Sequence, residues 1–341
     1  MSTAQRPRRR EPTLATVATL AGVSPATVSR VVNGTSNVTP GVREAVESAI
    51  EQLGYVPNRA ARSLVTRRTD SIALVVREPV EFGVADPYLS SIVVAASQSL
   101  LGTGVQLVVM LAQDDEHHAQ VSSFVRAGHV DGVILVSVHG DDPLPGQLVR
   151  ARIPFVMGGR PSTPLPGATY VDVDNRLGAR LATERLLATD HRRIATIAGP
   201  PDMTAATDRL AGFREALHEA GVAAAGVVHG RFTRESGVAA MRELLETEPD
   251  VEAVFAANDL MAVGALSALR AAGRRVPDDV AVVGFDDIAL AQDVDPALTT
   301  VHQPVAEEAR VMTREVLRQI GGEPAGEPVV LPPRLVVRAS G

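Results

Sequence analysis

The sequence predicts a small helical domain at the N-terminus, followed by a large α/β domain that consists of two similar lobes. The chain has 341 residues, which is too many for one ordinary domain. In the first sixty residues apolar positions recur at helical spacing, whereas from Ser71 onward short apolar strands alternate with helices. Charge is divided in the same way, because residues 1–70 carry ten arginines and five acidic residues, and the other 271 carry 23 and 35. We therefore expect the small domain, and not the large one, to bind a polyanion.

The composition is typical of a soluble globular protein, with 45% hydrophobic and 21% charged residues. The sequence has no apolar run near the roughly 18 residues of a membrane span. No apolar segment follows the basic residues 1–10, as it would in a secretory signal. The absence of cysteine excludes disulfides, thiolate zinc sites and cysteine nucleophiles. We expect a cytoplasmic protein without membrane contact, in which residues 1–12 are a disordered basic tail.

Three short helices are predicted in the N-terminal domain. Thr13 can cap the first, which Gly22 ends, and Ser24 can cap the second, with Pro25 at its first position. A third helix is expected over residues 39–54. Two short helices joined by a tight turn with glycine are typical of a helix-turn-helix, although a plain three-helix bundle fits this pattern as well. Mutual burial of the apolar faces would leave the beginning of the second helix exposed.

The N-terminal domain resembles a known family in the run LATVATLAGVSPATVSRVVNGTSNVTPGVREAVESAIEQLGYVPNRAARSL. Its AGVSxATVSRVVNG core and LGYVPNRAARSL ending resemble the DNA-binding headpiece of the lactose-repressor/galactose-repressor family of bacterial transcription regulators. The resemblance implies a helix-turn-helix DNA-binding domain over residues 13–57, and a hinge helix and linker over residues 58–69. It also implies that the second predicted helix lies in the major groove of a DNA operator. There Arg30 can bind a guanine edge through two hydrogen bonds, with a phosphate contact as the alternative.

The same resemblance implies which residues contact DNA. Pro25 and Ala26 fall where the family contacts base edges, but their side chains can make only van der Waals contacts. Leu64 matches the apolar side chain that the family inserts at a central base step in the minor groove, with a plain linker as the alternative. Ala61 is small enough to let two hinge helices approach each other. The residues assigned to DNA binding are Thr13, Ser24, Pro25, Ala26, Thr27, Ser29, Arg30, Asn33, Asn58, Arg59, Ala61 and Leu64.

Two series of short apolar strands separated by helices predict the architecture of the large domain. Such alternation is typical of a parallel sheet covered by helices on both faces. Two series, joined through the proline-rich segment 161–166, indicate two doubly wound lobes with a ligand cleft beyond the carboxyl ends of their strands. Strands are expected at 71–76, 106–111, 132–136 and 155–157 in the first series, at 169–173, 193–197, 226–229, 253–256 and 281–284 in the second, and at 335–337 closing the second lobe.

Residues 71–338 resemble the sugar-binding core of the same family, which shares its fold with periplasmic binding proteins. The segments AGPPDMTAATDRLAGF, VFAANDLMAVGAL, DVAVVGFDD and PALTTVHQP carry this resemblance. It implies an effector-binding and dimerisation domain over residues 70–338. The first lobe would comprise about 70–166 and 304–327, and the second lobe about 167–303 and 328–338.

Individual effector-binding residues are implied by the same segments. Arg209 matches the family's cleft arginine, whose planar fork can hold hydroxyl groups or a carboxylate. Asn258 and Asp286 match polar positions that bind sugar hydroxyls, and Phe232 matches an aromatic position that packs on a sugar face. For Asp86 and Tyr88, loop capping is the alternative. The complete set is Asp86, Tyr88, Gly159, Arg160, Arg209, Phe232, Asn258, Asp286 and Gln303.

The segments RAGHVDGVILVSVHGDDPLPG and MGGRP are most similar to the cellobiose-responsive repressors of actinobacteria. Gly158 and Gly159 stand where many relatives carry a polar side chain, and its loss would widen the first-lobe wall for a disaccharide. The resemblance implies a repressor of sugar-utilisation genes that cellobiose or a cello-oligosaccharide, a small carbohydrate, releases from its operator. The alternatives are another oligosaccharide, a purine or phosphosugar corepressor, and a sugar-binding transport protein.

We expect no enzymatic activity, no cofactor and no metal. The sequence contains no GxSxG, HExxH or P-loop motif, and the neighbouring Asp286 and Asp287 point apart, unlike a catalytic pair. A pseudo-palindromic operator requires two headpieces related by a two-fold axis, so a homodimer is expected. Tetramers in this family use a C-terminal leucine-heptad helix, which Pro332 and Pro333 would interrupt.

Overall fold

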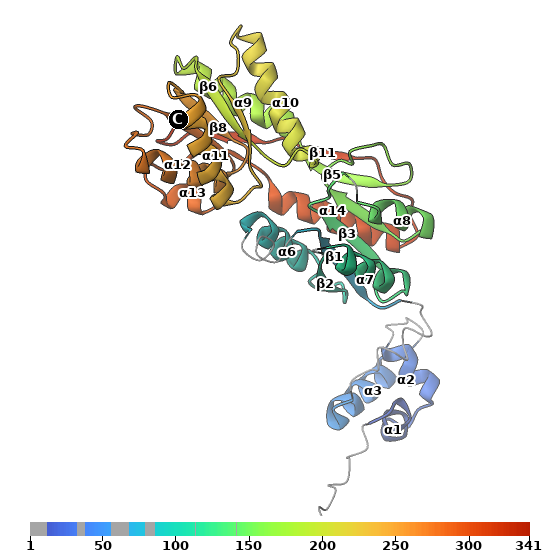
Figure 1. The fold of residues 1–341 in the computed structure, drawn as a ribbon. Helices are drawn as coiled ribbons and strands as arrows, with labels where there is room; N and C mark the ends of the chain where they lie inside the picture. The colour runs from blue at the N-terminus through green and yellow to red at the C-terminus, as the bar shows by residue number, and fades with distance from the viewer. Residues whose placement is uncertain (1–11, 33–37, 56–67, 79–85, 113, 141) are drawn as a thin grey trace, which may run out of the picture. The chain divides into compact units, whose positions relative to one another are not determined.

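The computed structural model describes residues 12–32, 38–55, 68–78, 86–112, 114–140 and 142–341, and divides into two compact units (Figure 1). The first unit is Met1–Thr69 and the second is Asp70–Gly341. The expected basic tail up to residue 11 and the expected hinge segment up to residue 67 lie outside the described residues.

The first unit is a helix-turn-helix built on local capping signals. Its helices are α1 (Leu14–Leu20), α2 (Pro25–Val32) and α3 (Pro40–Leu53), close to the bounds expected from the sequence. The hydroxyl of Thr13 accepts the Thr16 N–H at the start of α1, and that of Ser24 accepts the Thr27 N–H at the start of α2. The three helices bury a common core of Val17, Ala18, Val28, Val31, Val46, Ala49 and Tyr55.

The turn between α1 and α2 has the geometry of a helix-turn-helix. Gly22 adopts a φ of +68°, which costs glycine little, and the two helices meet at a bend of 104°. Helices in this motif typically cross at about 90–120°. Among the described residues no single helix is long and apolar enough to span a membrane; this bent pair meets the length and composition criteria only when its two helices are joined.

The first lobe of the second unit is a parallel sheet with helices on both faces. The strand order is β11-β5-β4-β3-β1-β2. Helices α6 (Pro87–Ser99) and α14 (Val305–Ile320) supply side chains to the core on one face, and α7 (Asp115–Arg126) and α8 (Leu144–Ala151) to the core on the other. The strands are β1 (Ser71–Val76), β2 (Gln106–Leu111), β3 (Gly132–Val136), β4 (Phe155–Gly158), β5 (Thr169–Val173) and β11 (Val329–Leu331).

The second lobe repeats this architecture, with strand order β12-β10-β9-β8-β6-β7. Helices α9 (Asn175–Ala188) and α10 (Thr204–Glu219) cover one face, α11 (Arg234–Thr247) and α12 (Asp259–Ala271) cover the other, and α13 (Leu290–Asp293) follows β9. The strands are β6 (Ile194–Ala198), β7 (Val227–His229), β8 (Ala253–Ala256), β9 (Ala281–Asp286), β10 (Thr299–His302) and β12 (Arg334–Val336). The last strand pairs antiparallel with β10 and closes this lobe, as expected.

The lobe boundaries expected from the sequence are wrong at two strands. Strand β5 was assigned to the second lobe but lies in the first sheet, between β4 and β11, and β11 is misassigned in the same way. The chain therefore crosses between lobes near residues 174, 303 and 332, and the segment 161–166 lies within the first lobe. A buried parallel strand is apolar in either sheet, so its local pattern does not specify which sheet it joins.

Helices α9 and α10 approach so closely that one position on α10 requires glycine. A Cβ on Gly212 would lie 2.1 Å from the carbonyl oxygen of Arg176, a backbone atom that cannot move without shifting α9. We expect Gly212→Ala to lower the free energy of unfolding of the large domain by about 1–3 kcal/mol, and hence its Tm by several degrees. Thermal denaturation followed by circular dichroism would measure this.

The matched control is Gly146→Ala on α8, where the nearest atom to a new Cβ is the flexible Arg150 Nη1 at 3.4 Å. There the gain in helix propensity should leave Tm unchanged or slightly higher. An equal change in Tm for both variants would show that the close approach of α9 and α10 does not require glycine at position 212.

Candidate functional site

One side of α2 and its N-cap is exposed to solvent, with both polar and small apolar side chains. Ser24, Pro25, Ala26 and Arg30 are exposed, whereas Val28 and Val31 on the opposite side are buried in the core of the first unit. The Ser24 and Thr27 hydroxyls lie 2.9 Å apart at the N-terminus of the helix, where backbone N–H groups favour phosphate oxygens. This surface therefore has the composition of a helix that reads a DNA groove.

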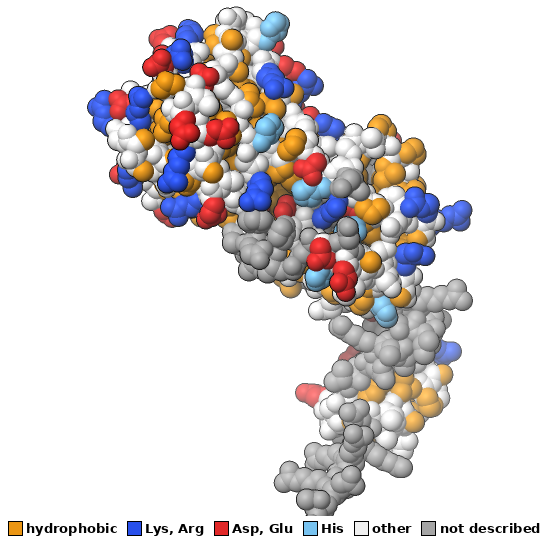
Figure 2. All heavy atoms as spheres, viewed as in Figure 1, with side chains coloured by type: hydrophobic (Ala, Val, Ile, Leu, Met, Phe, Trp, Pro, Cys, Tyr) orange, Lys and Arg blue, Asp and Glu red, His pale blue; other side chains and the backbone are white. Residues whose placement is uncertain are grey.

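The structure describes only some of the other residues that are expected to contact DNA. Thr13 is exposed at the N-terminus of α1, and Thr27 and Ser29 are partly exposed. On the face shown in Figure 2, basic and acidic side chains of the described residues are interspersed across the second unit, so that face has no extended basic patch. The other expected DNA-binding residues lie outside the described residues: Asn33, Asn58, Arg59, Ala61 and Leu64.

The second unit contains a cavity between its two lobes. Its volume of about 260 Å³ is near the lower end of the range of small-molecule sites. The lining residues include the carboxyl ends of strands in both sheets, the usual binding edge of a doubly wound fold, and residues of the helices beside them. Eight of the nine expected effector-binding residues line it: Asp86, Tyr88, Gly159, Arg209, Phe232, Asn258, Asp286 and Gln303.

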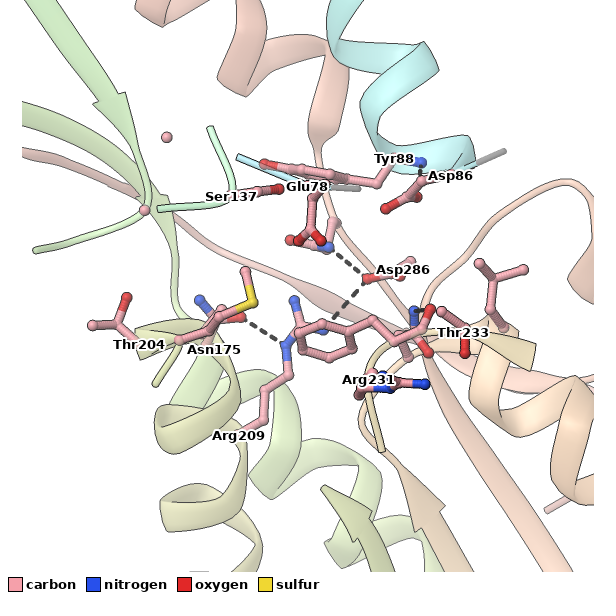
Figure 3. Close-up of a pocket in the computed structure, with 18 of the residues that line it drawn as sticks. Glu78, Asp86, Tyr88, Ser137, Asn175, Thr204, Arg209, Arg231, Thr233 and Asp286 are labelled. Carbon is pink, nitrogen blue, oxygen red and sulfur yellow. Dashed lines mark hydrogen bonds and ion pairs between the residues drawn. The ribbon is translucent and has the colours of Figure 1, made fainter. Parts of the chain in front are cut away.

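Arg209 of α10 lines this cavity and is buried (Figure 3). Its Nε donates to Asn175 Oδ1 at 2.8 Å and its Nη1 donates to the Ala257 carbonyl at 2.6 Å. The guanidinium lies 3.7 Å from the centre of the Phe285 ring, and Nη1 is 3.6 Å from Asp286 Oδ1. These contacts fix the planar group in one orientation, so that it offers preorganised donors to a ligand.

Two carboxyl groups of the cavity, those of Asp286 and Asp86, are held in environments that disfavour their charge. Burial raises the pKa of Asp286 to about 7, against the opposing effect of the Arg209 charge, and Gln303 Nε2 donates to its Oδ1 at 2.6 Å. Burial also raises the pKa of Asp86 to about 6. Asp86 accepts the Tyr88 N–H at 2.8 Å and so caps α6, which confirms the capping role given as its alternative in the sequence analysis. Asp86 also lines the cavity.

Phe232 and Asn258 form one wall of the cavity in the second lobe. Phe232 has a φ of +58°, a strained value for a side chain of this size, and Asn258 Nδ2 donates to its carbonyl oxygen at 3.0 Å. Asn258 Oδ1 accepts the Met261 N–H and caps α12. A Cβ on Gly199 would lie 2.3 Å from the Phe232 ring, so the close packing of this ring requires glycine there. Asn258 thus positions Phe232 as well as lining the site.

Several lining residues were not anticipated from the sequence, among them Glu78, Asp172, Asn175 and Glu308. Asp172 Oδ1 accepts the Val173 N–H and Asn175 Nδ2, and burial raises the pKa of Asp172. Asp172 is a charged residue within the apolar strand TYVDV, and such a residue can indicate a ligand site. The sequence pattern, however, places this strand in the other lobe. No cluster of three or more His, Asp or Glu side chains suited to a metal ion occurs among the described residues.

Arg160 does not line the cavity, contrary to expectation. Its Nε and Nη2 donate to the two carboxylate oxygens of Asp208 at 2.6 and 2.7 Å, and its carbonyl oxygen accepts the Thr204 hydroxyl at 2.8 Å. Arg160 follows β4 of the first lobe, whereas Asp208 and Thr204 belong to α10 of the second. The guanidinium is therefore engaged in a bidentate bridge between the lobes rather than directed at a ligand.

A second bridge between the lobes lies nearby. His139 Nδ1 lies 2.5 Å from Asp202 Oδ2, and the Gly140 N–H donates to the Asp202 carbonyl at 2.9 Å. Glu78 Oε1 is 3.8 Å from His139 Nε2. The carboxylates of Glu78 and Asp202 together raise the pKa of His139 to about 9, so this imidazole is protonated at neutral pH.

A helix-turn-helix unit and a two-lobed domain with a polar cleft, present in one chain, define a ligand-responsive DNA-binding regulator. The family model for bacterial regulatory proteins of the lacI family matches residues 13–58, and a periplasmic binding protein-like domain matches residues 165–341. The chain belongs to the lacI family.

The relatives of this chain include named transcription regulators. It is 53% identical to the HTH-type transcriptional regulator CelR of Thermobifida fusca, over 98% of this chain and 99% of that protein. It is 37% identical to the ribose operon repressor of Escherichia coli K12, over 86% and 88%.

Two solved structures cover nearly the whole chain. A transcriptional regulator CelR–cellobiose complex covers 97% of this chain and 100% of its own, with a TM-score of 0.78 and 49% identity. A lac repressor dimer bound to operator and the anti-inducer ONPF covers 97% and 99%, with a TM-score of 0.84 and 28% identity.

The His139 bridge makes a pH dependence testable. Because the pKa of His139 is higher in the folded chain than its ordinary 6.5, its contribution to stability is complete below about pH 6.5 and is lost as the pH rises through 9. We expect His139→Asn to destabilise the large domain by about 1–2 kcal/mol at pH 6, after allowance for solvent screening, and very little at pH 10. Thermal denaturation between these values measures the difference.

His218→Asn, at an exposed position on α10, is the control and should give no such pH-dependent difference. A difference in stability between wild type and His139→Asn that stays constant from pH 6 to pH 10 would contradict the raised pKa of His139.

Proposed function

We propose that this chain is a sequence-specific DNA-binding repressor of sugar-utilisation genes, released from its operator by cellobiose or a short cello-oligosaccharide. The single observation that carries the proposal is its 53% identity to CelR over 98% of the chain. A solved CelR structure is a complex with cellobiose. The protein would act on DNA in the cytoplasm and would not be an enzyme, since the relatives named above are transcription regulators.

The chemistry of the cavity supports a neutral, polyhydroxylated effector. Arg209 and Gln303 offer donors, Asp286 and Asp86 offer acceptors, and the Phe232 ring offers an apolar face, which is the mixture that sugars require. Among the described lining residues, Asp172 and Glu308 are buried beside the buried guanidinium of Arg209, whereas Arg231 and Arg234 are exposed. The buried part of the lining is thus more acidic than basic, which disfavours a phosphosugar corepressor.

The first-lobe wall supports an effector longer than a monosaccharide. Gly159 lines the cavity with a φ of +94°, and a Cβ placed there would have no atom within 4 Å. The loop after β4 therefore leaves open space where a side chain would otherwise project. This open space favours an effector with a second sugar ring. Other oligosaccharides of similar length are the alternative effectors.

Release from DNA would follow from linkage between the cleft and the lobe arrangement. A sugar that contacts Tyr88 of the first lobe and Arg209 of the second binds more tightly when the lobes are close together. It would therefore shift the population toward the closed arrangement by its differential affinity. A transport protein on the same fold would not need the helix-turn-helix unit, which disfavours that alternative.

Homodimerisation would use the large domain. Val94 on α6, Leu101 after this helix and Val109 on the edge strand β2 are large apolar residues that are about half or more exposed. Such residues on one edge of a sheet and its covering helix are typical of a protein interface. A second copy of this chain is the proposed partner, because a two-fold dimer places two headpieces on a pseudo-palindromic operator.

The effector proposal is tested at Arg209. We expect Arg209→Lys to weaken cellobiose binding by at least tenfold, because the lysine ammonium cannot reproduce the planar fork. Isothermal calorimetry measures the affinity, and gel shifts on an operator selected from random duplexes should show unchanged DNA binding without sugar. Arg214→Lys, exposed on the same helix, is the control. A variant that still leaves the operator at the wild-type cellobiose concentration would contradict this role of Arg209.

The dimer proposal is tested at Val94. Light scattering at micromolar concentration should give about twice the chain mass of 35.8 kDa for the wild type. Val94→Asp should shift the mass toward that of one chain, because a buried carboxylate at the interface would be unpaired. Val330→Asp is the matched control, since Val330 is 54% exposed and Val94 is 55% exposed. Equal masses for wild type and Val94→Asp would place the interface elsewhere.

A further inference from the structure

Glu308 is a buried carboxyl group that has no role in the mechanism proposed above. It lies in the first turns of α14, is 2% exposed and lines the cavity between the lobes. Its neighbours Ala309, Val311 and Met312 belong to the apolar core of the first lobe. The preceding Glu307, in contrast, is partly exposed and pairs with Arg310 on its own helix.

The hydrogen bonding of this carboxyl group is incomplete. The Tyr88 hydroxyl donates to Glu308 Oε1 at 3.2 Å, whereas Oε2 is buried and has no partner within the part of the chain that the structure describes. Leaving a buried oxygen without a hydrogen bond typically costs about 1–3 kcal/mol. An apolar residue would pack in this core without that cost, so the carboxyl group keeps hydrogen-bonding capacity that the described residues do not use.

The charged groups around Glu308 come from four packed elements. Asp172 of β5 and Asp286 of β9 disfavour its ionisation, Arg209 of α10 favours it, and the hydroxyl of Tyr88 on α6 stabilises the charged form. Burial is the largest effect and raises the pKa of Glu308 to about 8. The group is therefore mainly a neutral carboxylic acid at pH 7, which can donate one hydrogen bond as well as accept others.

The backbone beside Glu308 is kept free of side chains. Gly158, at the end of β4, lines the same cavity, and a Cβ on it would lie 3.1 Å from Met312 Sδ and 3.5 Å from Glu308 Oε1. A larger side chain at Gly158 would therefore crowd the carboxyl group. The next residue, Gly159, leaves open space. The two glycines thus place no side chain between this part of the first-lobe wall and the cavity.

From these contacts we propose that Glu308 and Tyr88 form a first-lobe subsite that binds one hydroxyl group of the effector through the Glu308 carboxyl group. This inference rests on the proposed function, because it takes the effector to be a neutral sugar. A ligand with a methylene group at this place would leave Glu308 unsatisfied, and an anionic group would be repelled by Asp172. Glu308 is thereby a specificity-determining residue.

The test measures cellobiose binding to the full-length protein by calorimetry at pH 7. Glu308→Leu should lower the affinity about 10–100-fold, and Glu308→Gln, which keeps a donor and an acceptor, should stay within a few-fold of wild type. Glu307→Gln, next to it but paired with Arg310, is the control and should bind as the wild type does. Thermal denaturation should show Glu308→Leu to be at least as stable as wild type, since it removes a buried polar group.

Cellobiose analogues that each lack one hydroxyl distinguish a direct contact from a packing effect. One analogue should bind to the wild type more weakly than cellobiose does. The same analogue should bind to Glu308→Leu as tightly as cellobiose does. The hydroxyl that this analogue lacks is then the one that Glu308 binds. If every analogue loses the same affinity against both proteins, or if Glu308→Leu binds cellobiose as tightly as wild type, the subsite is overturned. Failure of the wild type to bind cellobiose would instead overturn the proposed effector, and the subsite with it.

Discussion

The buried guanidinium of Arg209 connects the segments of the chain that form the cleft. It donates to Asn175 after β5 and to the carbonyl of Ala257 after β8, and it lies against the ring of Phe285 in β9. Strand β5 belongs to the sheet of the first lobe, and β8 and β9 belong to the sheet of the second, so one side chain on α10 contacts segments that follow or form strands of both sheets. Removing this charge would leave Asp286 buried and uncompensated, which is far more costly than losing an exposed ion pair.

The surroundings of Arg209 are acidic, and this determines what the cleft can bind. Asp172, Asp259, Asp286 and Glu308 are all largely buried, and burial raises the pKa of each. Asp259 is satisfied within the protein, since it accepts the Ile288 N–H and the Thr300 hydroxyl. The carboxyl groups that line the cavity retain free lone pairs or a proton, and these match hydroxyl groups better than phosphates or carboxylates.

The two lobes are also held by contacts outside the cavity. Arg160 and Asp208 form one bridge, and His139 and Asp202 form another, so the residues that line the cavity are not the only ones that hold the lobes in this arrangement. In the proposed mechanism, a ligand would supply only the free-energy difference between the open and closed lobe arrangements. Specificity can reside in the residues facing the cavity, while the bridges set how readily the lobes close.

The sequence alone determined the elements whose signals are local. The caps at Thr13 and Ser24, the glycine turn at Gly22 and the apolar periodicity specified the helix-turn-helix, and the motifs around Arg209 and Asp286 indicated residues that line the cavity. The tertiary structure alone decided the sheet to which β5 belongs, the bridging contact of Arg160 and the burial of Glu308 in the cavity wall. The reason is physical: an apolar strand, an arginine after a strand and a glutamate on a helix have the same local pattern whichever partner they meet, and that partner is supplied by residues far away in the chain.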